Sequence, residues 1–418
     1  MNLKIRLTVM NFLEFAVWGA YLTSMGTFLF KAGYGSHIGF FYSIQGIVSL
    51  FMPGIMGIIA DRWVQAQRLL SACHLFAAAF MIAAGLYGMT DGFSIGILFP
   101  LYSLSVAFYM PTLALSNSVA FNALNQAGMD TVKDFPPIRV FGTVGFIFTM
   151  WAVDFLGFQP TSQQFLLSGS LSVVLAVYSL TLPQVPVRSA SSASGEKPTL
   201  VQALGLDAFR LFKRYDMAVF FIFSMLLGVS LQITNGFANP YITSFQNIPE
   251  YADTFGARHA NILISISQIS EAFCILLIPL FLKRFGIKRV MMIAMMAWVL
   301  RFGLFGLGNP GSGVWMFVIS CIVYGVAFDF FNVSGALFVD SNTDTGIRSS
   351  AQGLFMIMTN GLGATIGTLT AQAIINHYVY AFPENAQLPG WRTSWMIFAA
   401  YALVVFILFT IFFRPKKS

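Results

Sequence analysis

A carboxylate and an amide lie within an apolar stretch of this chain, where polar side chains are rare. Glu271 and Gln268 belong to residues 260–282 (ANILISISQISEAFCILLIPLFL), which are otherwise long and apolar enough to cross a bilayer. A charged side chain at the bilayer centre costs about 2.5–3.5 kcal/mol, so such residues usually face a protein-lined cavity. Gln268 lies one helical turn before Glu271, on the same face. The pair therefore predicts a polar site inside a membrane bundle.

Further polar and aromatic residues in apolar stretches recur at helical spacing, three or four positions apart, so each set shares a face. The sets are Glu14 with Trp18; Arg139 with Thr143 and Phe146; Gln232 with Asn235; and Tyr324 with Phe328 and Asn332, beside Asp329. Amides and carboxylates bond hydroxyls and base edges, and aromatic rings stack on flat rings. This combination favours a nucleoside as the bound solute. A free sugar also fits, but it would use the aromatic rings less fully.

Each of these residues also has a simpler interpretation. The amides could join helices by hydrogen bonds, and single Phe or Tyr rings could face the core or the lipid. Glu271 and Asp329 could be structural ion-pair partners, and Arg139 could anchor the cytoplasmic end of its span. We expect Arg301 to be a snorkelling or packing residue, because its span offers no polar companion one turn away.

The composition identifies the elements that must position these residues. The chain of 418 residues is 57% hydrophobic and 9% charged, against about 25% charged residues in soluble domains. It is therefore an integral membrane protein, and no segment resembles a soluble domain. We predict an all-α fold of twelve transmembrane helices, at residues 7–30, 38–60, 69–89, 93–123, 137–158, 165–182, 217–245, 260–282, 290–307, 314–339, 349–376 and 394–413.

The basic residues predict the orientation of these spans. If the amino terminus is cytoplasmic, the loop Lys and Arg fall on the cytoplasmic side except for Lys31, Arg258 and Arg392. This positive-inside pattern places both termini in the cytoplasm. It also accounts for the net charge of +7, so we do not expect nucleic-acid binding.

Enzymatic chemistry has little support in the sequence. The three Cys and four His residues form no ligand spacing or Cys/His catalytic arrangement. We therefore predict no catalytic residue, no metal and no cofactor. A membrane receptor or sensor is a weaker alternative to a transporter, because no attached soluble domain could transmit a signal.

A hydrophilic segment at residues 183–216 divides the chain into two six-helix halves. We predict an N-terminal bundle at 1–183, a cytoplasmic linker with an interfacial helix at 184–216, and a C-terminal bundle at 217–418. The loops at 57–68 and 279–289 correspond in the two halves. The first contains Asp61 and Arg62 and resembles the G-x-x-x-D-R…R signature of the major facilitator superfamily, which predicts a conformational gating loop. Such duplicated transporters bind substrate near the midplane.

The chain resembles the bacterial nucleoside:proton symporters within that superfamily. The resemblance runs from Met1 to about Phe413 and rests on strings such as MPGIMGIIADRW, DFPPIRVFGTVGF, LQITN, SISQISE and VYGVAFDFFNVSG. It implies a multi-pass inner-membrane importer that moves nucleosides with protons by alternating access and functions as a monomer in the lipid. The binding residues that it implies are Arg139, Thr143, Phe146, Gln232, Asn235, Gln268, Glu271, Tyr324 and Phe328. A sugar permease or a drug exporter of the superfamily remains the alternative.

The resemblance also implies proton carriers. Glu271 or Asp329 could take a proton from outside and release it inside, because a buried carboxylate is costly to keep charged. The first span reads NFLEFAVWGA, with Glu14 where the resemblance leads us to expect Gln. Glu14 is therefore a third candidate for proton coupling.

Overall fold

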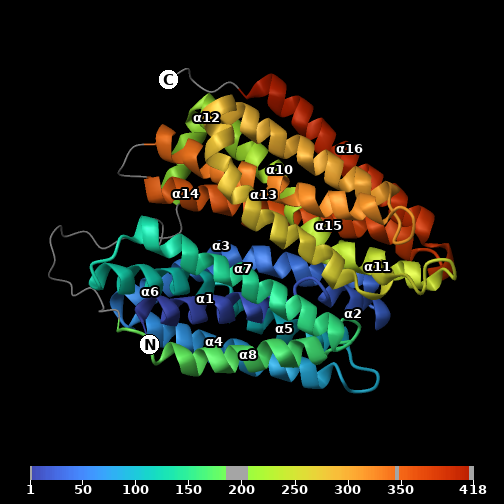
Figure 1. Ribbon diagram of the computed structural model, residues 1–418, viewed down its shortest axis with the longest axis horizontal. Coiled ribbons are helices and arrows are strands. Elements are labelled where there is room, and N and C mark those ends of the chain that lie inside the picture. Colours follow the sequence, from blue (N-terminus) through green and yellow to red (C-terminus); the bar gives the residue numbers. More distant parts are fainter. Residues whose placement is uncertain (1, 185–205, 344–347, 414–418) are drawn as a thin grey trace. The chain divides into compact units, whose positions relative to one another are not determined.

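The computed structural model describes residues 2–184, 206–343 and 348–413 (Figure 1). Within these ranges the chain is helical and contains no strand. Nine helical stretches of the described residues are long and apolar enough to cross a membrane. One of them, Ala260–Leu307, holds two predicted spans, the shorter helix Gln163–Ser179 supplies another, and residues 3–31 supply one in two pieces. The helices therefore account for all twelve predicted spans, and the predicted fold class is confirmed.

The chain folds into two compact units. The first holds residues up to Phe28 and those from Ile47 through α8, and the second holds Leu29–Gly46 and the helices from η2 onward. The segment Leu29–Gly46 packs with its unit through the side-chain amide of Gln372, whose oxygen accepts from Gly39 N at 2.5 Å. The same amide donates to Gly35 O at 3.1 Å. Consequently α3 begins in the second unit and ends in the first.

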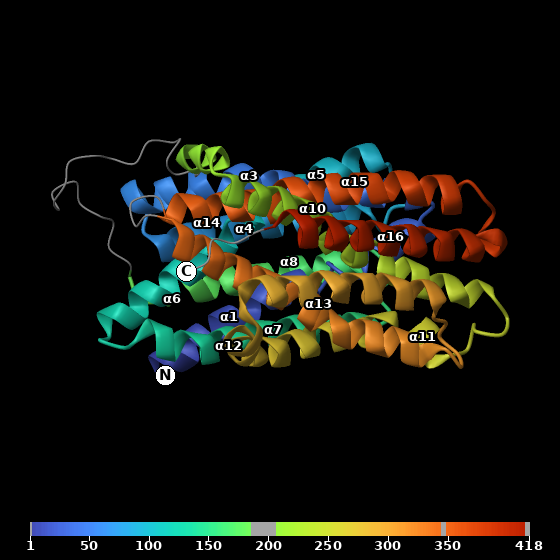
Figure 2. The ribbon, with the colours of Figure 1, turned by 90° about the horizontal axis from the view of Figure 1, so that it is seen from above.

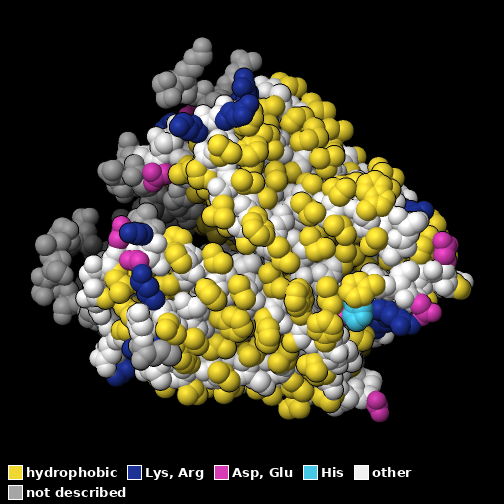
Figure 3. Space-filling view, viewed as in Figure 1, with side chains coloured by type: hydrophobic (Ala, Val, Ile, Leu, Met, Phe, Trp, Pro, Cys, Tyr) yellow, Lys and Arg dark blue, Asp and Glu magenta, His cyan; other side chains and the backbone are white. Residues whose placement is uncertain are grey.

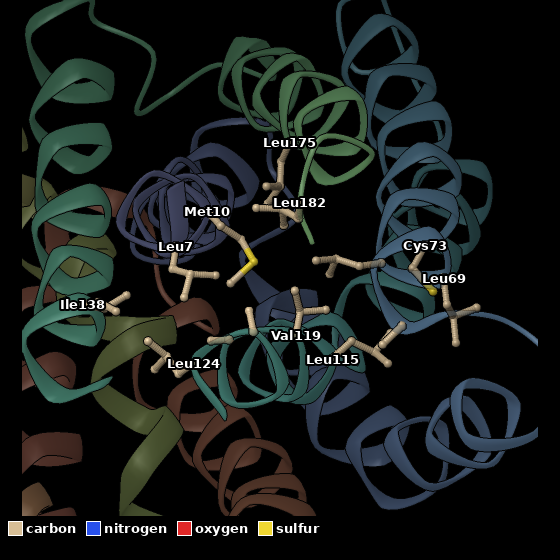
Figure 4. Close-up of a cluster of buried hydrophobic side chains, with 14 of the residues drawn as sticks. Leu7, Met10, Leu69, Cys73, Leu115, Val119, Leu124, Ile138, Leu175 and Leu182 are labelled. Atoms are coloured by element: carbon tan, nitrogen blue, oxygen red, sulfur yellow. The ribbon is translucent and has the colours of Figure 1, made fainter. Parts of the chain in front are cut away.

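The first unit contains eight labelled helices, of which the second and third are shared with the other unit as described. They are α1 (Leu3–Gly19), α2 (Met25–Lys31), α3 (Ile38–Arg62), α4 (Ala66–Tyr87), α5 (Ile95–Tyr109), α6 (Thr112–Gln126), α7 (Thr131–Phe155) and α8 (Gln163–Ser179). Their apolar faces meet in a buried cluster, in which Met10 of α1 and Val119 of α6 point toward each other (Figure 4). Leu69 and Cys73 of α4 and Leu175 of α8 also belong to this cluster.

Two predicted spans of the first unit are interrupted. The first divides into α1 and α2 at the turn that follows Gly19, and the fourth divides into α5 and α6 at Met110 and Pro111. Pro111 caps α6, which agrees with the preference of proline for helix starts, where its missing N–H is not needed. Hydropathy alone does not reveal such breaks, because they are short and carry no charged residue.

The second unit is built from longer helices, several of which run side by side in Figures 1 and 2. It contains η2 (Leu206–Lys213), α10 (Tyr215–Ser244), η3 (Phe245–Asn247), α11 (Phe255–Arg258), α12 (Ala260–Leu307), α13 (Val314–Asn342), α14 (Arg348–Met356), the π-helix η5 (Ile357–Gly363), α15 (Ala364–Ile375), the π-helix η6 (Asn376–Tyr380), η7 (Glu384–Ala386) and α16 (Leu388–Phe412). The predicted interfacial helix of the linker is described only as η2, a 3₁₀-helix. The linker residues before Leu206 lie outside the described ranges.

The helix α12 contains two predicted spans. Its backbone leaves the helical region at Gly286, with φ 73° and ψ 167°. A positive φ is readily adopted only by glycine. Gly286 therefore marks the turn that the sequence places between the eighth and ninth spans.

Large apolar side chains cover the outer faces of these helices. Leu276 is 74% exposed, Phe273 66% and Phe148 61%. Figure 3 shows hydrophobic side chains along the helices, while most charged side chains gather near helix ends. An apolar surface of this extent is stable only against lipid or another apolar partner, which agrees with helices that cross a membrane.

Glycines bring α10 into backbone contact with the eleventh span. A Cβ at Gly367 would lie 2.1 Å from Val229 O, one at Gly363 would lie 2.4 Å from Met225 O, and one at Gly228 would lie 2.3 Å from Thr359 O. Gly363 and Gly367 are four residues apart, the spacing of close helix pairs in membranes. Only glycine fits at these positions without moving a helix.

We therefore expect Gly367→Leu to lower the free energy of unfolding by about 1–3 kcal/mol, the usual cost of overpacking. Gly303→Leu is the matched control, because a Cβ there meets nothing within 4 Å. Thermal unfolding of the two purified variants in detergent measures the difference. Equal melting temperatures for both would contradict this account of the contact.

Candidate functional site

The second unit carries three polar or aromatic sets on neighbouring helices. On α10, Asn235 Nδ2 donates to Gln232 Oε1 at 2.9 Å, so the two amides form one half-buried polar patch. Their spacing of three residues places them on the same face of the helix, as the sequence predicts. Asn235 still has its side-chain oxygen, and Gln232 its amide nitrogen, for other partners.

On α12, Gln268 and Glu271 differ in exposure. Gln268 is 9% exposed, and its Oε1 has no hydrogen-bond partner among the described residues. Glu271 is half-buried and interacts electrostatically with Tyr324 of α13. A buried acceptor without a donor costs about 1–3 kcal/mol. Gln268 therefore offers a place for a donor from a bound solute.

On α13, the rings of Tyr324 and Phe328 are stacked, with centroids 5.5 Å apart and planes inclined by 12°. Asn332 donates from Nδ2 to Phe328 O at 3.0 Å, so its amide is engaged with its own helix. Asp329 is only 4% exposed and also interacts electrostatically with Tyr324. The helix thus places an aromatic pair beside a buried carboxylate.

Of the two expected roles of Arg301, snorkelling is wrong, because the side chain is buried, whereas packing is compatible with its contacts. Arg301 is 2% exposed, and its Nη1 donates to Ser320 O at 2.9 Å and to Ser267 Oγ at 3.3 Å. Its guanidinium carbon lies 4.4 Å from the centroid of the Tyr324 ring. Its polar partners come from other turns and another helix. A search of the ninth span for a polar residue one turn away could therefore not find them.

In the first unit, α7 presents Arg139, Thr143 and Phe146. The guanidinium carbon of Arg139 lies 3.9 Å from the centroid of the Phe15 ring, and Thr143 is half-buried. Phe146 is 7% exposed and meets Trp18 edge-on, with centroids 6.2 Å apart and planes at 85°. This face therefore combines a cation, a hydroxyl and aromatic rings.

Glu14 and Trp18, four residues apart, both meet Tyr109, whose ring centroid lies 6.2 Å from that of Trp18, but the Glu14 carboxyl has polar partners of its own. Glu14 is 0% exposed, and its Oε2 lies 3.0 Å from His74 Nε2 of α4. Its Oε1 accepts from Thr112 Oγ1 at 2.6 Å, and its backbone oxygen accepts from the Tyr109 hydroxyl at 2.8 Å. Glu14 thus joins α1 to the helices that carry these three residues.

Both ring nitrogens of His74 have polar partners. Nδ1 lies 2.8 Å from Ser172 Oγ, and the same hydroxyl lies 3.0 Å from His74 O. Nε2 faces the Glu14 carboxyl. His74 was missed from the sequence because it lies 60 residues from Glu14 and belongs to no motif.

The side chains of Asp61 and Arg62, at the end of α3, lie outside the part of the structure that is described. Among the side chains that are described, no group of three or more His, Cys, Asp or Glu residues could hold a metal ion. The polar and aromatic residues of these faces offer hydrogen bonding, aromatic stacking and proton binding.

Twelve helical spans, with polar and aromatic faces inside the bundles, define a membrane transporter of the major facilitator type. The model of the nucleoside H+ symporter family matches residues 1–418. Xanthosine permease of Escherichia coli is 45% identical over 424 residues, which cover 100% of this chain and 98% of the relative. Nucleoside permease NupG of the same organism is 44% identical over 419 residues, covering 100% and 97%. The chain therefore belongs to the nucleoside H+ symporter family.

Solved structures agree with this assignment. The crystal structure of nucleoside transporter NupG matches with a TM-score of 0.89 at 43% identity and covers 100% of both chains. A D-xylose–proton symporter matches with a TM-score of 0.69 at 12% identity, covering 100% of this chain and 99% of that one. The second likeness shows the shared fold alone. The protein is a proton-coupled nucleoside importer and a multi-pass protein of the bacterial inner membrane.

Proposed function

We propose that nucleosides are recognised by the polar and aromatic faces of α10, α12, α13 and α7. The proposed binding residues are Arg139, Thr143, Phe146, Gln232, Asn235, Gln268, Glu271, Tyr324 and Phe328. The observation that carries the proposal is the buried amide oxygen of Gln268, which has no donor among the described residues. A nucleoside supplies hydroxyl and N–H donors for this oxygen and a flat base for the stacked rings of Tyr324 and Phe328.

We expect Gln268→Leu to weaken uridine binding about tenfold. The variant loses the acceptor, and a hydrogen bond of this kind contributes about 1.4 kcal/mol, which corresponds to a factor of ten in Kd. Titration of purified protein with uridine measures the change. Thr370→Val is the control, because Thr370 is exposed and bonds only its own helix. An unchanged Kd for Gln268→Leu would remove this residue from the site.

For the proton, we propose Asp329 as the carrier and Glu271 chiefly as a hydrogen-bonding partner of the substrate. The support is their difference in burial, because Asp329 is 4% exposed whereas Glu271 is half-buried. A more deeply buried carboxylate is more costly to keep charged. Glu14, the third candidate, is engaged by Thr112 and His74, which favours a structural role. The proton would load and leave as transport proceeds by alternating access.

The substrate range can be tested against the sugar permease and drug exporter alternatives. Unlabelled nucleosides should compete with labelled uridine for uptake, whereas ribose and free bases should compete weakly, because each offers only part of the contacts. Ribose competing as strongly as uridine would favour a sugar permease. Competition by unrelated apolar cations would favour an exporter.

The remaining proposals concern membrane context. We infer from the distribution of Lys and Arg that both termini are cytoplasmic, that the exposed apolar faces contact lipid, and that one chain suffices for transport. Asp61 and Arg62 would belong to a gating loop on the cytoplasmic side. Accessibility of single introduced cysteines at residues 2 and 418 to impermeant reagents tests the orientation.

A further inference from the structure

Arg301 is a buried cation in the same unit as the proposed proton carrier. It lies in the second half of α12 and is 2% exposed. No carboxylate among the described residues lies within ion-pair distance of its guanidinium. Its Nε also has no hydrogen-bond partner in the described part of the chain. A buried charge without a counter-charge is costly, so its presence calls for a functional explanation.

The contacts of Arg301 lead to the proposed binding face. Ser267, which accepts from Nη1 at 3.3 Å, directly precedes Gln268. Ser320 bonds Arg301 reciprocally, because its carbonyl accepts from Nη1 at 2.9 Å and its hydroxyl donates to Arg301 O at 2.8 Å. These bonds fix the guanidinium between the two halves of α12 and the helix α13.

Tyr324 connects this cation with the carboxylates. The guanidinium carbon of Arg301 is 4.4 Å from the centroid of the Tyr324 ring, while Phe328 stacks on that ring at 5.5 Å. Glu271, Arg301 and Asp329 all interact electrostatically with Tyr324. One cation and two carboxylates therefore act on the same aromatic ring, in a medium where charges are weakly screened.

Resting on the function proposed above, we infer that Arg301 is a positioning residue: a fixed positive charge that orients Tyr324 and stabilises the ionised carboxylates after the proton has left. Once the proton has left, this positive charge would offset part of the negative charge that remains in the bundle interior. Arginine suits this role because its guanidinium stays charged when buried and also stacks on aromatic rings.

The other titratable groups on α12 and α13, and on the helices that pack against α12, have contacts of their own. On the same two helices, Cys274 interacts with Glu271 and Asp329, and Cys321 interacts with Arg301, but neither thiol is cationic. The helices α10, α11 and α16 also pack on α12. Their titratable or charged residues are Tyr215, Asp216, Tyr241, Arg258, Arg392 and Tyr401. Of the two cations, Arg258 pairs with Asp253 and Arg392 interacts with Tyr241. The basic residues of α12 itself, Lys283, Arg284, Lys288 and Arg289, lie at the turn around Gly286.

The test compares Arg301→Met with Arg301→Lys in proteoliposomes. A nearby positive charge favours the ionised form of a carboxylate, so removing it keeps the carboxylate protonated to higher pH. For Arg301→Met, the external pH of half-maximal uridine uptake should move about one unit toward alkaline pH. Arg301→Lys keeps the charge and should retain the wild-type pH. If Arg301→Met does not fold, Arg301→Gln makes the same comparison, since it keeps donors for Ser320 but no charge.

The outcomes separate this inference from the proposed function. The role of the charge would be overturned if Arg301→Met and Arg301→Gln kept the wild-type pH dependence of uridine uptake, or if Arg301→Lys shifted it as far as they do. Arg301 would then be a packing residue. Ser267→Ala, which removes one hydrogen bond without changing charge, should keep the wild-type profile. A different result, uridine accumulation by Asp329→Asn, would contradict the proposal that Asp329 carries the proton.

Discussion

Proteoliposomes that carry Asp329→Asn are expected to lose uridine accumulation driven by an inward proton gradient while still exchanging internal for external uridine. Asn matches Asp in size but cannot bind or release a proton. Each proton that accompanies a nucleoside can support about tenfold accumulation per pH unit, because one unit corresponds to about 1.4 kcal/mol. In the variant this ratio should fall to about one. Labelled uridine uptake under an imposed pH step measures it.

The control for Asp329→Asn is the same substitution at another buried acid. Asp154 is 5% exposed and accepts from Gln159 Nε2 at 2.8 Å. It lies at the end of α7, in the first unit, and belongs to none of the polar faces. Asp154→Asn should therefore accumulate uridine like the wild type. Wild-type accumulation by Asp329→Asn would instead favour Glu271 as the proton carrier. Accumulation by Glu271→Gln would then test that assignment.

The second large effect concerns Glu14 and His74. We expect Glu14→Ala to lower the free energy of unfolding by about 3–5 kcal/mol, because breaking a buried pair leaves its partners unsatisfied. Thr112 and His74 would both lose a hydrogen bond inside the bundle. Glu14→Gln keeps the size and a hydrogen-bonding amide and should cost much less. Denaturant unfolding in detergent micelles measures these differences.

A double-mutant cycle tests whether the pair acts as a unit. The combination of Glu14→Ala and His74→Ala should cost less than the sum of the two single changes, by about 1–3 kcal/mol, as for residues in direct contact. Additive costs would show that the 3.0 Å contact contributes nothing specific. Normal proton-driven uptake by Glu14→Gln would further assign Glu14 to structure, whereas loss of coupling with normal stability would restore it as a proton carrier.

The sequence predicts the helices well because hydropathy reports directly on burial in lipid. Twelve apolar stretches and the turns between them are visible in the hydropathy along the chain. The turn at Gly286, between the two halves of α12, falls within the loop that the sequence predicts between the eighth and ninth spans. The break at Pro111 within the fourth span is not visible, because that span is apolar on both sides. Helical spacing likewise predicts which residues share a face of one helix, as Gln232 and Asn235 do.

Partners from different spans could not be predicted in this way. His74 meets Glu14 across a separation of 60 residues, and Arg301 meets Ser267 across 34. Such pairs depend on which helices pack together and in which register, and spacing along one helix does not report on this. The burial of Arg301 is therefore the clearest feature that the structure adds to the candidate site.

The central claim is that nucleoside and proton enter together, and it is tested most directly by following both in one sample. Wild-type proteoliposomes containing a pH-sensitive dye would be given labelled uridine outside, with no imposed pH gradient. We predict that the interior acidifies as uridine enters and that Asp329→Asn abolishes the acidification. Entry of uridine into wild-type vesicles without any internal acidification would contradict the account.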